Sequence, residues 1–227
     1  MRFADLNWMD IEGYLAGEDR LILVVGACEQ HGYLSLLSDV KIPLALADAA
    51  SELTGILVAP PVNFGCSPYF QNYPGTISLR ISTLLDVVED IIRSVYHNGF
   101  RRVLLLNGHG GNDAARMRIY EILNNLPGLR MSWYSWWTAS SVVKVAEKND
   151  LIPAHANWLE AFPFTKVADM PDQSKNPPRI PGLLGAADVK QIYQDGSFGG
   201  FYEVSSHIMD EIFNTALQDI LQLLKFE

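Results

Sequence analysis

The chain has 227 residues, of which 48% are hydrophobic and 19% are charged, and its formal net charge is −9 at pH 7. This balance excludes a disordered chain and is typical of a globular protein with a sizeable core. The acidic excess argues against a nucleic acid or an anionic membrane as the main partner, because both carry negative charge. We therefore expect one globular domain over residues 1–227, with no nucleic-acid and no membrane partner.

The cysteines and the apolar runs narrow the class further. Cys28 and Cys66 show no CxxC spacing, which excludes a disulfide scaffold and a thiolate zinc finger. Residues 1–8 lack the basic and apolar regions of a signal peptide, and no apolar run reaches the ~18 residues of a membrane span. These features predict a cytoplasmic protein.

Strands and helices are predicted to alternate along the chain. Short apolar runs that end near glycine, proline or polar residues predict strands at 21–25, 55–59, 101–106 and 129–137, with a further short strand at 76–79. Apolar residues at helical spacing predict helices at 6–17, 40–53, 82–98, 113–124, 138–148 and 206–226. This alternation predicts an α/β fold with a mainly parallel sheet covered on both faces.

Helix ends and loops carry their own signals. Pro43 is expected in the first turn of its helix, and Ser82 and Gly99 suit the N-cap and C′ positions of theirs. Residues 62–72 predict a long loop, and residues 153–162 predict a loop that enters a helix. The proline-rich residues 167–184 predict an irregular excursion, and residues 195–200 predict a turn.

The first candidate site follows the strand predicted at 21–25. Glu29 and His31 come directly after this strand, and Asp39 follows a short loop later. Ligands in open α/β sheets bind outside the carboxyl ends of strands. Two carboxylates and an imidazole at that edge make a metal site of O/N/O type. A Glu-x-His pattern alone is more often a pair of polar loop residues, so the assignment depends on further ligands.

A second candidate follows the strand predicted at 101–106. His109 lies in the glycine-rich sequence Asn-Gly-His-Gly-Gly-Asn of residues 107–112, where glycines allow the backbone to approach a ligand closely. Two other interpretations stay open, which are a tight turn with an exposed His109 and a phosphate-binding loop before a helix. The missing Lys-Ser/Thr pair argues against a phosphate-binding loop.

A third pair completes the candidate ligand set. His155 and Glu160 are five residues apart, a rotation of ~500° on a regular helix, so they converge only if a helix begins between them. The whole set is Glu29, His31, Asp39, His109 and Glu160. One of its carboxylates bridging two divalent cations would complete a two-metal site that activates water.

Four blocks of the chain resemble the motifs of the creatininase (creatinine amidohydrolase) family. They are Glu-Gln-His-Gly at 29–32 with Asp39, then residues 73–79, residues 107–112, and His155-Ala156 with Glu160. The resemblance implies a three-layer α/β/α fold with a mainly parallel sheet. It also implies a binuclear metal site, hydrolysis of C–N amide bonds, and a homo-oligomer, commonly a hexamer.

The resemblance also implies a role for individual residues. Glu29 and His109 bind one ion, His31 binds the other, Asp39 bridges them, and His155 moves a proton. Trp136 is the candidate for a substrate-covering tryptophan. Backbone N–H groups of Gly110 and Gly111 are candidates for stabilising an oxyanion. Tyr33, in the loop between the first ligands, is a candidate substrate contact.

Two departures from the family pattern bear on the substrate. The loop between Glu29 and Asp39 is one residue shorter and contains Tyr33-Leu34-Ser35 where the family usually has Pro-His-Leu-Pro. Gly111 stands where the creatinine-cleaving branch has a glutamate that binds the second ion, so Glu160 is expected to supply that ligand. The second departure argues against creatinine itself as the substrate.

The leading hypothesis is a metal-dependent hydrolase that cleaves a C–N bond in a small-molecule amide, either a cyclic amide or a formamide. It would use two divalent ions, Zn²⁺ first, with Mn²⁺ or Fe²⁺ as alternatives. The altered Tyr33-Leu34-Ser35 loop motivates a rival hypothesis, a non-catalytic ligand-binding or assembly subunit that keeps the fold. A weaker alternative is a phosphate-binding α/β enzyme that uses residues 108–111.

Overall fold

The centre of the molecule is a sheet of four parallel strands in the order β2-β1-β3-β4. β1 (Arg20–Val25) and β3 (Arg102–Asn107) are the two inner strands and pair along their whole length, from Arg20 opposite Arg102 to Val25 opposite Asn107. The loops that follow them therefore leave the sheet side by side at its carboxyl edge. The structure, a computed structural model, describes residues 1–180 and 182–227.

The remaining elements are two outer strands and seven helices within the described residues. The outer strands are β2 (Leu57–Val58) and β4 (Arg130–Ser135). The helices are α1 (Trp8–Leu15), α2 (Ser38–Thr54), α3 (Ile81–Asn98), α4 (Asp113–Asn125), α5 (Ser140–Lys148), α6 (Ala186–Tyr193) and α7 (Ser206–Leu223).

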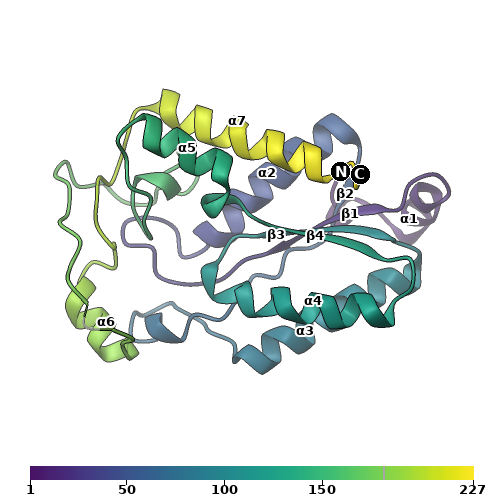
Figure 1. The fold of residues 1–227 in the computed structure, drawn as a ribbon, viewed down its shortest axis with the longest axis horizontal. Coiled ribbons are helices and arrows are strands. Elements are labelled where there is room, and N and C mark those ends of the chain that lie inside the picture. Colours follow the sequence, from purple (N-terminus) through teal and green to yellow (C-terminus); the bar gives the residue numbers. More distant parts are fainter. Residues whose placement is uncertain (181) are drawn as a thin grey trace.

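Helices cover both faces of the sheet, which confirms the predicted α/β fold with a mainly parallel sheet (Figure 1). α2, α5 and α7 lie on one face, and α3 and α4 lie on the other. Successive residues of β1 alternate between the two cores, with Ile22 in the first and Leu23 in the second. Both faces are buried, and this explains the continuous apolar runs of the inner strands. Each fully buried leucine or isoleucine contributes about 1.5–3 kcal/mol to folding.

Some predicted boundaries hold and others are wrong. Gly99, with φ of +116°, follows α3 as expected, because glycine adopts this left-handed conformation without a Cβ penalty. Ser82 is not the N-cap, since α3 begins at Ile81 after Arg80, whose side chain makes no capping hydrogen bond. The strand predicted at 76–79 is reduced to an isolated antiparallel bridge between Ile77 and Cys28.

Further differences lie after β4. The strand predicted to reach residue 137 ends at Ser135, and Trp136–Thr138 form a 3-10 turn. The helix expected within 153–162 is a single 3-10 turn, Trp158–Glu160. Helix α6 was missed by the sequence analysis, which had no pattern for it after the proline-rich excursion. No helix in the described part of the chain combines the length and apolarity needed to cross a membrane.

Pro43 lies inside α2, and the prediction that it falls in the first turn was wrong because the helix begins earlier, at Ser38. Proline has no N–H, so it cannot donate to the carbonyl of Asp39 four residues before it. This carbonyl lies against the loops that follow the inner strands. A Cβ at Gly108 would overlap the Asp39 carbonyl oxygen, and a Cβ at Gly26 would lie 2.6 Å from it. The first turn of α2 therefore contacts both strand ends through two glycines.

Candidate metal centre

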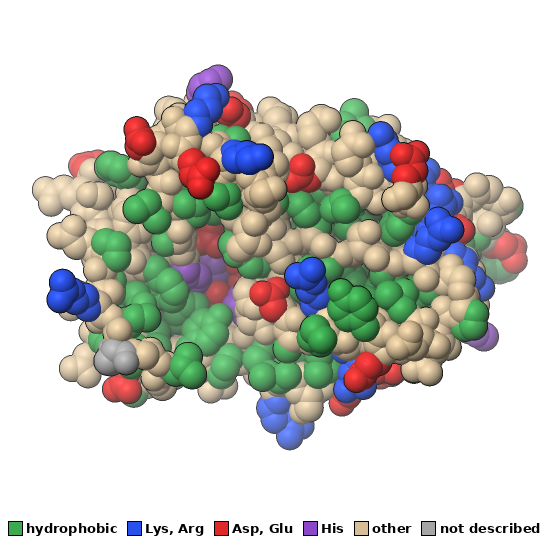
Figure 2. All heavy atoms as spheres, in the orientation of Figure 1, with side chains coloured by type: hydrophobic (Ala, Val, Ile, Leu, Met, Phe, Trp, Pro, Cys, Tyr) green, Lys and Arg blue, Asp and Glu red, His purple; other side chains and the backbone are tan. Residues whose placement is uncertain are grey.

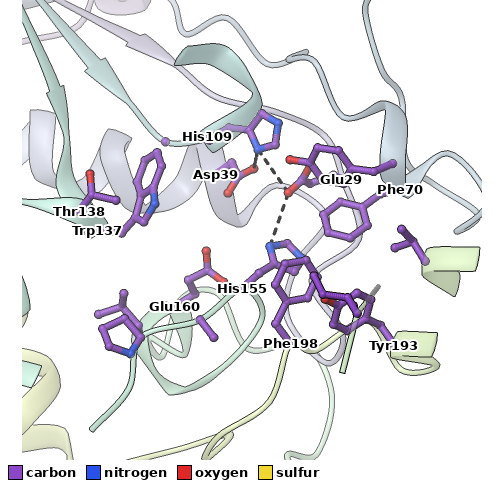
Figure 3. Close-up of a pocket in the computed structure, with 18 of the residues that line it drawn as sticks. Glu29, Asp39, Phe70, His109, Trp137, Thr138, His155, Glu160, Tyr193 and Phe198 are labelled. Carbon is purple, nitrogen blue, oxygen red and sulfur yellow. Dashed lines mark ion pairs between the residues drawn. The ribbon is translucent and has the colours of Figure 1, made fainter. Parts of the chain in front are cut away.

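The predicted ligands converge at the carboxyl edge of the sheet (Figure 3). Glu29 and His31 lie in the loop after β1, Asp39 in the first turn of α2, and His109 directly after β3. All four are buried, with exposed fractions of 1% to 4%. Glu160 ends the 3-10 turn that faces them. The parallel pairing of β1 and β3 thus brings together residues far apart in the sequence.

The first group of ligand atoms comes from Glu29, Asp39 and His109. His109 Nδ1 lies 3.3 Å from Glu29 Oε1 and 3.1 Å from Asp39 Oδ2. On its other side, His109 Nε2 donates to the main-chain carbonyl of Cys66 at 2.9 Å. This contact places the ring proton on Nε2 and turns the lone pair of Nδ1 toward two carboxylates.

The second group comes from His31, Asp39 and Glu160. His31 Nε2 lies 3.0 Å from Asp39 Oδ1 and 3.6 Å from Glu160 Oε1. His31 Nδ1 donates to the main-chain carbonyl of Glu29 at 3.1 Å, so again the unprotonated nitrogen faces two carboxylates. Asp39 belongs to both groups and contributes one oxygen to each.

A lone pair facing two carboxylates repels them unless a positive charge lies between. Burial by itself lowers the pKa of His31, but the carboxylates of Asp39 and Glu160 outweigh it and raise that pKa well above its usual range. For His109, burial is likewise outweighed by Glu29 and Asp39, which raise its pKa. Each group of atoms therefore favours a bound cation, either a proton or a metal ion.

The carboxylates have the chemistry to hold a metal ion in place of protons. Glu29 Oε2 and Asp39 Oδ2 are buried and have no hydrogen-bond partner among the described residues. Burial raises the pKa of Glu29, whereas for Asp39 burial is outweighed by the neighbouring His31 and His109, which lower the pKa of its carboxyl group. Buried acceptors without a donor cost stability unless a cation coordinates them. Carboxylate oxygens and imidazole nitrogens suit Zn²⁺, Mn²⁺ or Fe²⁺.

His155 lies beside the cluster and belongs to neither of these two groups. Its Nδ1 is 3.7 Å from Glu29 Oε1, and its Nε2 lies 3.0 Å from the Gln30 carbonyl and 2.8 Å from the Gln30 side-chain nitrogen. Its ring stacks on Phe70 with centroids 4.6 Å apart. Burial, followed by the nearby His31, lowers the pKa of His155 well below its usual range. The ring is therefore neutral, with Nδ1 facing the carboxylates.

A cavity of about 720 Å³ opens above the cluster, and Glu29, Asp39, His109, His155 and Glu160 all line it. In Figure 2 acidic and histidine side chains lie at the bottom of a hollow that is surrounded by hydrophobic side chains. Catalytic and binding groups at the bottom of an apolar cavity are the usual arrangement of a small-molecule site.

Of the predicted substrate contacts, some line the cavity and others do not. Gly110 lines the cavity, but Gly111 does not. Trp136, expected to cover the substrate, is 2% exposed and packs edge-on against Phe162 in the core, while Trp137 lines the cavity. The expectation for Trp136 is therefore corrected: within the 3-10 turn Trp136–Thr138 the first tryptophan points into the core and the second, Trp137, lines the cavity.

The altered loop lies away from the cavity. Tyr33 is absent from the lining and packs edge-on against Tyr202, with ring centroids 5.5 Å apart. Leu34 is buried, and its N–H donates to the His31 carbonyl at 2.9 Å. The ligand atoms are therefore grouped despite the altered loop, and Tyr33, predicted as a substrate contact, lies outside the cavity lining.

The structure shows why position 111 is a glycine and which residue supplies the carboxylate that the family pattern places there. A Cβ at Gly111 would overlap the carbonyl oxygen of Cys66, so this backbone has no room for a glutamate there. Glu160 instead presents its Oε1 toward His31, while its Oε2 accepts from the N–H of Ala156 at 2.6 Å. The carboxylate of the second group thus comes from the 3-10 turn Trp158–Glu160, which follows α5.

Sequence reasoning missed several cavity residues. The aromatic side chains of Phe70, Tyr193 and Phe198 line the cavity together with Trp137. Two of them, Tyr193 and Phe198, lie in or just after the missed helix α6. The aromatic sequence at 133–137 did indicate a tryptophan near the cavity. Strand alternation could not identify which one, because the strand ends at Ser135 and Trp137 lies beyond it.

Comparison with known proteins identifies related chains. The family model for creatininase, described as creatinine amidohydrolase, matches residues 4–224. Creatinine amidohydrolase of Pseudomonas putida is 38% identical over 116 residues, which are 48% of this chain and 45% of that protein. The mycofactocin precursor peptide peptidase of Mycolicibacterium smegmatis is 35% identical over 102 residues, 42% of this chain and 41% of that protein. The chain thus spans less than half of the length of these curated relatives.

Solved structures match over more of the chain. A type II tryptophan-to-phenylalanine variant of creatininase aligns with a TM-score of 0.83 at 25% identity, covering 97% of this chain and 96% of that one. A structure described as Mn creatininase aligns with the same TM-score, identity and coverage. The backbone arrangement described above is therefore shared with these structures over nearly its whole length.

Proposed function

The chain belongs to the creatininase family, and from this premise we propose that it is a metal-dependent hydrolase that cleaves a C–N amide bond. One observation carries the proposal. Two buried histidines each direct a ring nitrogen at two carboxylates, and both groups share Asp39. The names of two matched relatives, an amidohydrolase and a peptide peptidase, support C–N cleavage as the reaction.

Two groups of side chains would hold the cations. Glu29, Asp39 and His109 would bind one ion, and His31, Asp39 and Glu160 the other. Bound divalent cations supply Lewis acidity for the amide carbonyl and lower the pKa of water from ~15.7 toward ~7. We propose Zn²⁺ first and Mn²⁺ or Fe²⁺ as alternatives, a choice supported in part by the Mn creatininase neighbour.

The proton transfer is assigned to His155. A neutral imidazole at the edge of the cluster can take up a proton at Nδ1 and give it to the leaving nitrogen. Its ring is held between Gln30 and Phe70, so Nδ1 stays directed at the cluster. The backbone of Gly110 lines the cavity beside His109 and is the candidate donor to a developing oxyanion.

The proposal also covers the substrate, the oligomeric state and the cellular location of the protein. We propose a small-molecule amide as substrate, a homo-oligomer with a hexamer favoured, and a cytoplasmic location. The acidic net charge of −9 supports the absence of a nucleic-acid or membrane partner. The altered loop that motivates the non-catalytic alternative leaves the cavity lining unchanged in one respect, since Tyr33 packs on Tyr202 outside the cavity.

Metal analysis combined with an amide-hydrolysis assay tests the proposed function. The protein should bind about two divalent ions per chain, and His31→Ala should lose one of them together with most turnover. His97→Ala is the matched control, because this exposed histidine lies near the end of α3, away from the cavity. A protein that binds no divalent ion and hydrolyses no amide would support the non-catalytic alternative instead.

A further inference from the structure

We propose that the substrate is an uncharged amide whose leaving amine carries an aromatic or bulky aliphatic group, which packs against Phe70, Tyr193 and Phe198. This inference rests on the proposed function, because it needs His155 to act at the leaving nitrogen. It adds what the ligand cluster alone does not specify, namely the class of substrate and the direction in which the substrate lies.

The size of the cavity is the first argument. Its volume of about 720 Å³ would hold about two dozen water molecules at roughly 30 Å³ each. An amide group without a further substituent would fill only a minor part of it. Volumes in this range usually accept ligands with extended apolar parts.

The charge of the lining is the second argument. The acidic groups that line the cavity are Glu29, Asp39 and Glu160, and the described part of the lining contains no lysine or arginine. A carboxylate or phosphate on the substrate, away from the metal ions, would meet apolar side chains and no counter-charge. Burial of an unpaired charge is strongly unfavourable, so the substrate groups that occupy the cavity are uncharged.

The aromatic side of the cavity is the third argument. The rings of Phe198 and Tyr193 stack with centroids 4.2 Å apart at 23°, and Phe70 lies 5.9 Å from Phe198. Val189 extends this side from α6. In Figure 3 these rings lie on one side of the cavity, and Trp137 lies on the other. Aromatic rings bind a further ring or a branched aliphatic group well, by stacking and by apolar burial.

This aromatic side is held in place without a ligand. Lys175 Nζ donates to the carbonyls of Tyr193 at 2.6 Å and Ser197 at 2.7 Å, and it also pairs with Asp195. Tyr202 donates to the other oxygen of Asp195 at 2.6 Å. The segment that carries the rings is therefore preorganised, which reduces the entropy that a ligand loses on binding.

His155 sets the direction of the substrate. Its ring centroid lies 4.6 Å from that of Phe70 and 5.0 Å from that of Phe198, so it stands between the ligand cluster and the aromatic side. The leaving nitrogen must approach His155 to receive a proton. The substituent on that nitrogen then continues toward the aromatic rings, and the acyl part extends toward Trp137 and Thr138.

Three acetamides separate size from charge. N-(2-phenylethyl)acetamide fits the proposal, N-methylacetamide removes the ring, and N-acetylphenylalanine keeps the ring but adds a carboxylate. With metal-loaded protein, the first should be hydrolysed with a kcat/KM at least about tenfold above that of each other compound. Equal rates for the three compounds would overturn the inference while leaving the proposed function intact.

Calorimetric titration with the same compounds gives a readout that needs no turnover. N-(2-phenylethyl)acetamide should bind to the metal-loaded protein about tenfold more tightly than N-methylacetamide. Selective binding without hydrolysis of any of them would contradict the proposed function and keep the recognition argued here. Binding that does not distinguish the compounds would contradict the recognition.

A matched pair of phenylalanine variants localises the effect. Phe198→Ala should reduce the preference for the phenylethyl compound about tenfold, and Phe198→Leu should reduce it less, because leucine keeps part of the apolar contact. Phe164→Ala is the control, since Phe164 stacks on Phe162 outside the cavity and should leave the preference unchanged. A preference that survives in Phe198→Ala with unchanged melting temperature would overturn the assignment of this side.

Discussion

The floor and the aromatic side of the cavity are built in different ways. The floor consists of ligands attached to the ends of β1 and β3 and to the start of α2, and it is buried. The aromatic side comes largely from α6 and the segment after it, which lie outside the sheet (Figure 1). The difference indicates that the ends of the inner strands and the start of α2 position most of the candidate ligands, whereas segments outside the sheet supply Glu160, His155 and the aromatic rings. Three experiments, ordered by expected effect, test this division.

The shared ligand gives the largest expected effect. Asp39→Asn keeps the shape of the side chain but removes the charge that both ligand groups use. We expect loss of metal and a fall in kcat of about 10³-fold or more, as for other groups that stabilise charge in the transition state. Metal content and single-turnover rates measure this.

Asp48→Asn is the matched control on the same helix, because Asp48 pairs with Arg2 far from the cavity. It should change metal content and kcat little. A fully metal-loaded, active Asp39→Asn protein would contradict the two-group site and the division between floor and aromatic side with it.

Metal removal should reverse the pH dependence of stability. Without metal, the raised pKa values of His31 and His109 add stability below the unfolded value of about 6.5, and this stability is lost as pH rises through the folded values. With metal, protons compete for the same nitrogens, so stability falls as the pH is lowered. The melting-temperature difference between holo and apo protein should therefore be larger near about pH 8 than near about pH 6. Equal differences at both pH values would contradict the ligand roles of the two histidines.

Replacement of Trp137, on the side of the cavity opposite Phe70, Tyr193 and Phe198, should have the smallest effect on catalysis. Trp137→Ala should raise KM up to about tenfold with little change in kcat, because the ring lines the cavity away from the ligands. Trp136→Phe is the matched comparison: it should lower stability by about 1–3 kcal/mol and leave KM unchanged, since Trp136 lies in the core. An effect on kcat as large as that of Asp39→Asn would show that Trp137 acts in the chemistry itself.

The same division separates what the sequence could predict from what it could not. Glu29 and His109 directly follow unambiguous apolar runs, and parallel pairing then brings the two strand ends together. For Glu160, spacing gave only a condition, that a helical turn begin after His155. The structure meets this condition with a 3-10 turn whose N-cap Asn157 accepts from the N–H of Leu159.

The aromatic side had no comparable signal. Helix α6 is eight residues long and follows a proline-rich excursion, and its inward-facing residues become apparent only once it packs against the turn that carries Phe70. Trp136 and Trp137 differ by one position, and the end of β4 decides which of them lines the cavity. Tertiary contacts therefore determine both the inward-facing residues of α6 and the choice between the two tryptophans, and a local sequence pattern does not reveal them.

The first turn of α2, with its free Asp39 carbonyl lodged where Gly26 and Gly108 have no side chain, has one more consequence. The backbone of the shared acid is thus packed directly against the backbone at the ends of the two central strands. Replacement of residues in α6 should therefore change the aromatic side of the cavity without moving the two groups of candidate ligands, whereas a single methyl group at Gly108 would displace Asp39, which both groups share.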